Sequence, residues 1–106
     1  MIATINCPDL KSWSTDGKEF QLIDVREVHE REICHIGGLH VPMGDIGQYI
    51  SQIRNDIPVV VYCHHGQRSL YVCTILATQA GFTNLYNLEG GIDAWARMVD
   101  ARVALY

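Results

Sequence analysis

The chain has 106 residues, close to the usual length of one domain, so we expect a single domain over residues 1–106. Twelve acidic and eight basic residues give a net charge of −4, which argues against nonspecific binding of nucleic acid. The sequence contains no run of about eighteen apolar residues, so we expect no membrane span. Residues 1–6 lack a basic cluster followed by an apolar stretch, which predicts a cytoplasmic protein with no membrane partner.

Short apolar runs alternate with helical patterns, and turns rich in glycine, proline and charged residues separate them. In chain order, we expect a strand at 2–5, a helix at 8–13, a strand at 20–25, a polar helix at 27–33, a strand at 39–41, helical spacing at 44–53, a strand at 58–63, a helix at 68–80, a strand at 84–88 and a helix at 92–98. This alternation predicts the α/β class, with a mostly parallel five-stranded central sheet flanked by helices on both faces.

The four cysteines form no C-x-x-C pair, which argues against a zinc ribbon or a dithiol redox site. We therefore expect four free thiols. Cys7 stands where a helix begins and is predicted to be a surface thiol, whereas Cys73 stands in a helical pattern and is predicted to pack in the core. Cys34, His35 and His40 match no standard ligand spacing, so we expect no metal site.

The segment V-V-V-Y-C-H-H-G-Q-R-S places Cys63 at the end of the most apolar predicted strand, just before a helix. Ligands of parallel sheets bind at the carboxyl ends of the strands, and a helix N-terminus presents free amides that attract an anion. Gly66 permits a positive φ, while His64, His65 and Arg68 add positive or polarisable groups. Such surroundings favour the reactive thiolate, so we predict that Cys63 is an activated nucleophile.

The length of this loop separates two kinds of chemistry. Four residues lie between Cys63 and Arg68, whereas cysteine phosphatases place five between their cysteine and arginine, and here the sixth residue after the cysteine is Ser69. A shorter loop makes a smaller ring of amides, which suits one sulfur atom better than a phosphate group. The spacing favours transfer of a single soft atom, and it disfavours a phosphatase or an arsenate reductase.

Four motifs, in order, resemble those of single-domain rhodanese-type sulfurtransferases over nearly the whole chain. They are L-I-D-V-R-E at 22–27, E-I-C-H-I-G-G-L-H-V-P at 32–42, Y-C-H-H-G-Q-R-S at 62–69 and G-F-T-N-L-Y-N-L-E-G-G-I-D-A-W at 81–95. The resemblance implies a rhodanese-like fold and a ping-pong transfer of sulfane sulfur through a persulfide on Cys63. It also implies a small anionic donor such as thiosulfate, or a persulfide donor, and a thiol acceptor, replaced by cyanide in vitro.

The resemblance further implies roles for the residues around the nucleophile. The donor would be bound by the loop residues His64, His65, Gly66, Gln67, Arg68 and Ser69. Arg68 would orient the loop and attract the anionic donor. No metal and no organic cofactor is expected. The alternative is a sulfur-relay or protein-interaction module that has little turnover of thiosulfate and takes sulfur from a partner protein.

Charged residues outside the loop are predicted to support the fold or to lie on the surface. Asp24 and Arg26 belong to the D-x-R motif and are predicted to form a supporting ion pair rather than to contact substrate. Glu27, Glu30 and Glu32 are predicted to form a solvated acidic face that could dock a basic partner.

Overall fold

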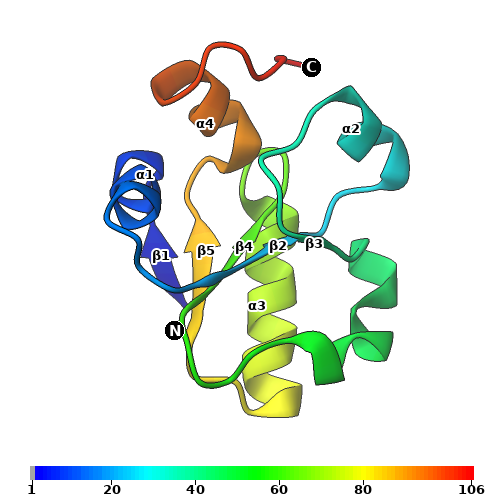
Figure 1. The fold of residues 1–106 in the computed structure, drawn as a ribbon. Helices are drawn as coiled ribbons and strands as arrows, with labels where there is room; N and C mark the ends of the chain where they lie inside the picture. The colour runs from blue at the N-terminus through cyan, green and yellow to red at the C-terminus, as the bar shows by residue number, and fades with distance from the viewer. Residues whose placement is uncertain (1) are drawn as a thin grey trace.

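The apolar runs of the sequence form a parallel sheet, as the computed structural model of the chain shows for residues 2–106 (Figure 1). Its strands are β1 (Ala3–Ile5), β2 (Gln21–Asp24), β3 (Leu39–His40), β4 (Val59–Tyr62) and β5 (Leu85–Leu88). Its helices are α1 (Cys7–Thr15), α2 (Val28–Ile33), α3 (Gln67–Ala80) and α4 (Gly91–Met98), with two 3₁₀ helices at Met43–Gln48 and Ile50–Gln52. The predicted α/β class is confirmed.

Strand β4 lies at the centre of the sheet, whose strand order is β1-β5-β4-β2-β3. All the pairings are parallel, with Val61 opposite Ile23 of β2 and opposite Asn87 of β5. Because parallel strands run the same way, the carboxyl ends of β2, β4 and β5 open on one edge of the sheet. The chain that follows β4 therefore starts in the middle of that edge.

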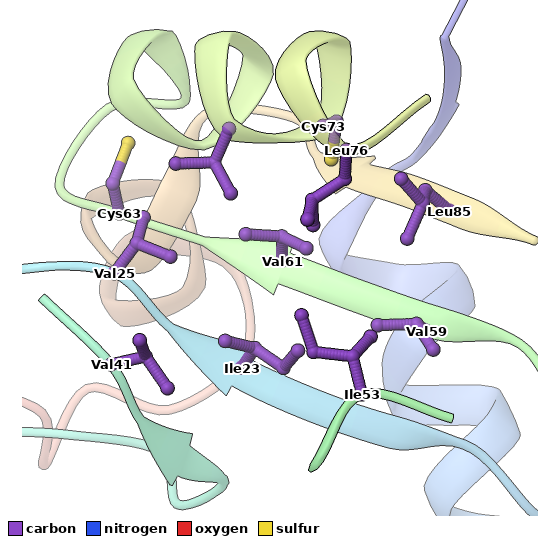
Figure 2. Packing of buried hydrophobic residues seen from close by; sticks show 11 residues of the cluster. Ile23, Val25, Val41, Ile53, Val59, Val61, Cys63, Cys73, Leu76 and Leu85 are labelled. Atoms are coloured by element: carbon purple, nitrogen blue, oxygen red, sulfur yellow. The ribbon is translucent and has the colours of Figure 1, made fainter. Parts of the chain in front are cut away.

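The core lies on both faces of the sheet, because β4 is apolar at every position. Val59 and Val61 belong to a cluster that packs under α3, with Leu76 of that helix (Figure 2). Val60 and Tyr62 belong to the opposite cluster, under α1 and α4. An apolar run without alternation is typical of a strand that is covered on both sides. None of the helices within residues 2–106 has the length and apolarity needed to cross a lipid bilayer.

The stretch predicted as one helical pattern at 44–53 forms two 3₁₀ helices instead. Gly44 and Gly47 disfavour a continuous α-helix because glycine has high backbone freedom. The backbone bonds run over three residues, as from the Tyr49 amide to the Ile46 carbonyl at 3.1 Å. Ile46 and Ile53 still pack in or against the core, whereas Ile50 is 39% exposed, so only two of the three isoleucines face the core.

The prediction that Cys7 is a surface thiol is wrong. Its side chain is 1% exposed and lies at the start of α1, where the Asn6 side chain caps the helix by accepting from the Asp9 amide at 2.8 Å. The Cys7 sulfur faces the carbonyl oxygens of Glu89 and Gly91, each at 3.8 Å. Burial raises its pKa to about 11, which makes this thiol unreactive at neutral pH.

Cys73 lies in the core under α3, where its side chain is fully buried. Burial raises its pKa to about 12. Two of the four thiols are therefore held in their neutral form by their surroundings.

Candidate active site around Cys63

Cys63 directly follows β4 and lies in the loop that leads into α3. Its sulfur accepts hydrogen bonds from the amide of Gly66 at 3.1 Å and from the amide of Ser69 at 3.3 Å. The Ser69 hydroxyl oxygen lies 3.3 Å from the same sulfur. Its one proton is donated to the side-chain oxygen of Asn87, so the Cys63 thiol is the donor in this contact. The side chain of Cys63 is 1% exposed. The loop therefore encloses the sulfur with groups that stabilise a negative charge on it.

The loop curls around the sulfur because its carbonyl groups are held on the outside. The first amides of α4 donate to the carbonyls of Cys63 and His64 at 2.9 and 3.0 Å, and the Asn87 side chain donates to the carbonyl of Gly66 at 3.0 Å. A planar trans peptide points its C=O and N–H in opposite directions, and no cis peptide occurs within residues 2–106. These contacts hold the loop from the outside, while the amides of Gly66 and Ser69 point at the sulfur.

Gly66 is needed at the turn into α3. Its φ is +101°, a conformation that residues with a side chain rarely adopt. A Cβ there would lie 3.3 Å from the Gly90 amide nitrogen and 3.4 Å from the Leu88 carbonyl oxygen. The glycine thus permits both the tight turn and the close approach of the loop to the segment after β5.

Asn87 is a site residue that the sequence analysis missed. It lies in β5, 6% exposed, and its side-chain oxygen accepts a hydrogen bond from the hydroxyl of Ser69. Its amide group holds the carbonyl of Gly66. Asn87 thereby fixes two of the residues that contact the Cys63 sulfur. The available signal was a polar residue within an otherwise apolar strand, L-Y-N-L.

Glu30 was predicted to lie on a solvated face, and this prediction is wrong. Its carboxylate is 7% exposed and forms a two-pronged ion pair with the guanidinium of Arg68, at 2.6 and 2.8 Å. The reason is geometric, because α2 follows β2 and lies next to the loop that follows β4. The hydrogen bonds from Arg68 lower the pKa of Glu30 to about 2. The positive charge expected to attract an anionic donor is therefore already paired.

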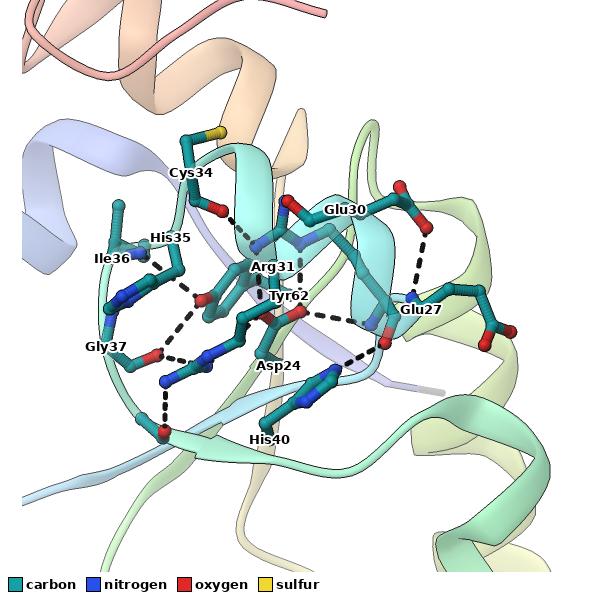
Figure 3. A network of polar contacts seen from close by, with 12 residues as sticks. Asp24, Glu27, Glu30, Arg31, Cys34, His35, Ile36, Gly37, His40 and Tyr62 are labelled. Atoms are coloured by element: carbon teal, nitrogen blue, oxygen red, sulfur yellow. Dashed lines mark hydrogen bonds and ion pairs between the residues drawn. The ribbon is translucent and has the colours of Figure 1, made fainter.

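Asp24 and Arg26 form a fully buried ion pair at 2.8 Å, beside α2. Figure 3 shows Asp24 in a polar network with Glu30 and Tyr62. All five N–H donors of the Arg26 guanidinium are used: two on Asp24, one each on the carbonyls of Glu30 and Cys34, and one on the hydroxyl of Tyr106. Burial would raise the pKa of Asp24, but the hydrogen bonds and charge of Arg26 outweigh burial and lower it. This pair supports the edge of the site without facing the Cys63 sulfur.

The two histidines after Cys63 lie at the rim, with their rings 3.9 Å apart. Burial, and then the neighbouring His65, lowers the pKa of His64. The ligand atoms of His64, His65 and Asp93 lie within 4.8 Å of one another. A tetrahedral zinc ion with bonds of about 2.1 Å needs its ligand atoms about 3.4 Å apart. Asp93 is also paired with Arg97 at 2.9 Å, so the group is not preformed as a metal site.

Gln67, the remaining predicted loop residue, starts α3. It lines a hollow with Met43, Arg68 and Tyr71. The structure therefore divides the predicted residues into two groups. Gly66 and Ser69 contact the sulfur directly, whereas the side chains of His64, His65, Gln67 and Arg68 form its rim.

The family model described as Rhodanese-like domain matches residues 7–98. The chain belongs to the rhodanese-like domain family. Among its relatives, a protein named sulfurtransferase from Allochromatium vinosum is 37% identical, with coverage of 92% of this chain and 91% of that protein. A protein named thiosulfate sulfurtransferase GlpE from Shewanella oneidensis is 34% identical, with coverage of 76% and 80%. This rhodanese-like domain therefore has relatives that are named as sulfurtransferases.

Larger proteins contain a similar domain. A probable adenylyltransferase/sulfurtransferase from Mycobacterium tuberculosis is 34% identical over 98% of this chain, which spans only 27% of that protein. Among solved structures, a rhodanese-related protein from Thermoplasma volcanium has a TM-score of 0.79 at 28% identity, with coverage of 98% of this chain and 99% of that one. A rhodanese-like domain from Anabaena has a TM-score of 0.82 at 25% identity, covering 93% and 76%.

The ion pair of Glu30 predicts how the stability of this rhodanese-like domain depends on pH. The pKa of Glu30 falls from an ordinary 4.5 to about 2 on folding, so its contribution is complete above about pH 4.5 and is lost as the pH falls towards 2. We expect Glu30→Gln to cost up to about 3 kcal/mol at pH 7 and much less at pH 3. Urea denaturation at both pH values measures this; an equal cost at both would contradict it.

Proposed function

We propose that this rhodanese-like domain is a sulfurtransferase that carries a sulfane sulfur as a persulfide on Cys63. The supporting observation is the pair of amide hydrogen bonds, from Gly66 and Ser69, that end on the Cys63 sulfur. Amides at a helix N-terminus favour a thiolate over a thiol, and the thiolate is the nucleophile. The relatives named sulfurtransferase support the same class of reaction.

In the proposed reaction, the Cys63 thiolate attacks the outer sulfur of thiosulfate or of an organic persulfide. A new S–S bond forms, the S–S bond of the donor breaks, and sulfite or a thiolate leaves with the electron pair. A thiol acceptor then attacks the terminal sulfur and releases the Cys63 thiolate. The first amides of α3 have no acceptor within the helix, so they are suited to hold the terminal sulfur. The scheme uses no metal and no organic cofactor.

A second candidate is a relay module that receives sulfur from a partner protein and turns over thiosulfate poorly. The ion pair between Arg68 and Glu30 favours this candidate, because it leaves the mouth of the site without an unpaired arginine for a dianion. The net charge of −4 also opposes the approach of thiosulfate. Steady-state turnover of thiosulfate, compared with turnover of a small organic persulfide, separates the two candidates.

Intact-protein mass spectrometry tests the proposed intermediate. After incubation with thiosulfate or with an organic persulfide, we expect a gain of about 32 Da, one sulfur atom. Peptide mapping should place the added sulfur on Cys63, and dithiothreitol should remove it. A protein that gains no sulfur from either donor, or gains it only on another cysteine, would refute the proposal.

A further inference from the structure

The segment after α4 returns to the active-site loop. Residues 99–106 run from the end of α4 across the carboxyl edge of the sheet towards α2 (Figure 1). Val103 packs against the core cluster under α1 and α4, and the Cys34 sulfur lies 3.4 Å from the carbonyl oxygen of Ala104. The segment is therefore fastened at two points before it reaches Tyr106.

Tyr106 contacts three parts of the site at once. Its ring stacks on the imidazole of His64, with centroids 3.9 Å apart and planes 4° apart. Its hydroxyl donates to the Glu30 carboxylate at 2.8 Å and accepts from the Arg26 guanidinium at 2.9 Å. Burial raises the pKa of Tyr106 to about 12, so the hydroxyl keeps the proton it donates. Glu30 is in turn the partner of Arg68.

These contacts affect the two side chains that could hold an anionic donor. The ring of Tyr106 covers His64, whose Nε2 is buried and has no hydrogen-bond partner within residues 2–106. The hydroxyl of Tyr106 holds Glu30 in place against Arg68. Burial lowers the pKa of His64 and Glu30 pairs with Arg68, so both side chains offer less positive charge to thiosulfate than the sequence motif suggests.

We propose that Tyr106 is a specificity-determining residue, which covers the rim of the Cys63 loop and disfavours small dianionic sulfur donors. This inference rests on the proposed sulfurtransferase activity. Because the side chain of Cys63 is 1% exposed, a donor reaches the sulfur only when part of the rim moves. Among these rim residues, Tyr106 is separated from the Cys63 loop by the longest stretch of chain. It contacts His64, Glu30 and Arg26 through its side chain.

Steady-state kinetics with thiosulfate as the donor tests this role. For Tyr106→Ala, we expect kcat/KM to rise about tenfold, through a lower KM at unchanged kcat, because His64 becomes accessible and Glu30 loses one of the contacts that hold it against Arg68. Tyr106→Phe keeps the stacking and loses both hydroxyl bonds, so its increase should be intermediate. Leu105→Ala, at an exposed neighbouring position, is the matched control and should equal the wild type.

Mass spectrometry of the Cys63 persulfide distinguishes failure of the role proposed for Tyr106 from failure of the proposed function. If the wild type forms the persulfide but both Tyr106 variants have the wild-type KM for thiosulfate, the role of Tyr106 is refuted and the proposed function stands. If neither the wild type nor the variants form the persulfide, both proposals are refuted. A thermal melt identifies loss of folding; should Tyr106→Ala not fold, the KM of Tyr106→Phe decides.

Discussion

Replacing Cys63 by serine is expected to lower the rate of sulfur transfer by about a thousandfold or more. A serine hydroxyl is not ionised at neutral pH and cannot carry a sulfur atom as a persulfide. The change is small in volume, and an oxygen can accept the amide hydrogen bonds that now end on the sulfur. We therefore expect the fold to survive, so that the loss reports on chemistry. The assay is transfer from an organic persulfide to a thiol or to cyanide.

Cys34→Ser is the matched control for that experiment. Cys34 is also a free thiol, only partly buried, and its sulfur contacts a backbone carbonyl oxygen, which a serine hydroxyl can also do. This variant should keep the wild-type rate. If Cys63→Ser keeps most of the activity while Cys34→Ser loses it, the nucleophile has been assigned to the wrong cysteine.

The architecture could be predicted because its signals are local. The apolar run at Val59–Tyr62 indicates a strand covered on both faces, and the structure buries all of its residues. Residues 44–53 were an exception, because the spacing of their isoleucines does not distinguish one α-helix from two short 3₁₀ helices. The burial of Cys7 could not be read from its neighbours, because α4 covers it from 84 positions farther along the chain.

The site could be predicted only in part, for a related reason. The groups that contact the Cys63 sulfur lie within six positions of it, so the sequence motif contains them all. The residues that set the charge and shape of the rim come from elsewhere in the chain. Glu30 is 38 positions from Arg68, Asn87 is 18 positions from Ser69, and Tyr106 is 76 positions from Glu30. Only the folded sheet brings them to one edge.

That difference changes the interpretation of the chemistry. The sequence motif indicates a loop that attracts an anionic donor through Arg68, whereas the structure pairs Arg68 with a buried carboxylate. A bidentate pair of this kind holds the guanidinium in one orientation, because the planar fork fits both carboxylate oxygens. Arg68 thus braces the first turn of α3 against α2. The amides that enclose the sulfur are fixed by this brace and by Asn87, without a free charge at the mouth.

The largest effect on stability is expected for Gly91→Ala, at the start of α4. Gly91 has a φ of +61°, and a Cβ there would lie 2.5 Å from the carbonyl oxygens of both Cys63 and His64. These are the two carbonyls that accept the first amides of α4, so the added methyl group forces the loop and the helix apart. We expect a loss of about 3 kcal/mol or more in the free energy of unfolding, with loss of sulfur transfer.

Gly81→Ala separates the two causes of that loss. Gly81 ends α3 with a φ of +73°, yet a Cβ there would have no neighbour within 4 Å. It carries the conformational cost alone, about 1–2 kcal/mol, and should leave the activity of the folded protein unchanged. Urea denaturation of both variants, with turnover measured where both are folded, compares them directly. Equal losses of stability would mean that glycine is required at position 91 because of its backbone conformation, and not because of the close contact between the Cys63 loop and α4.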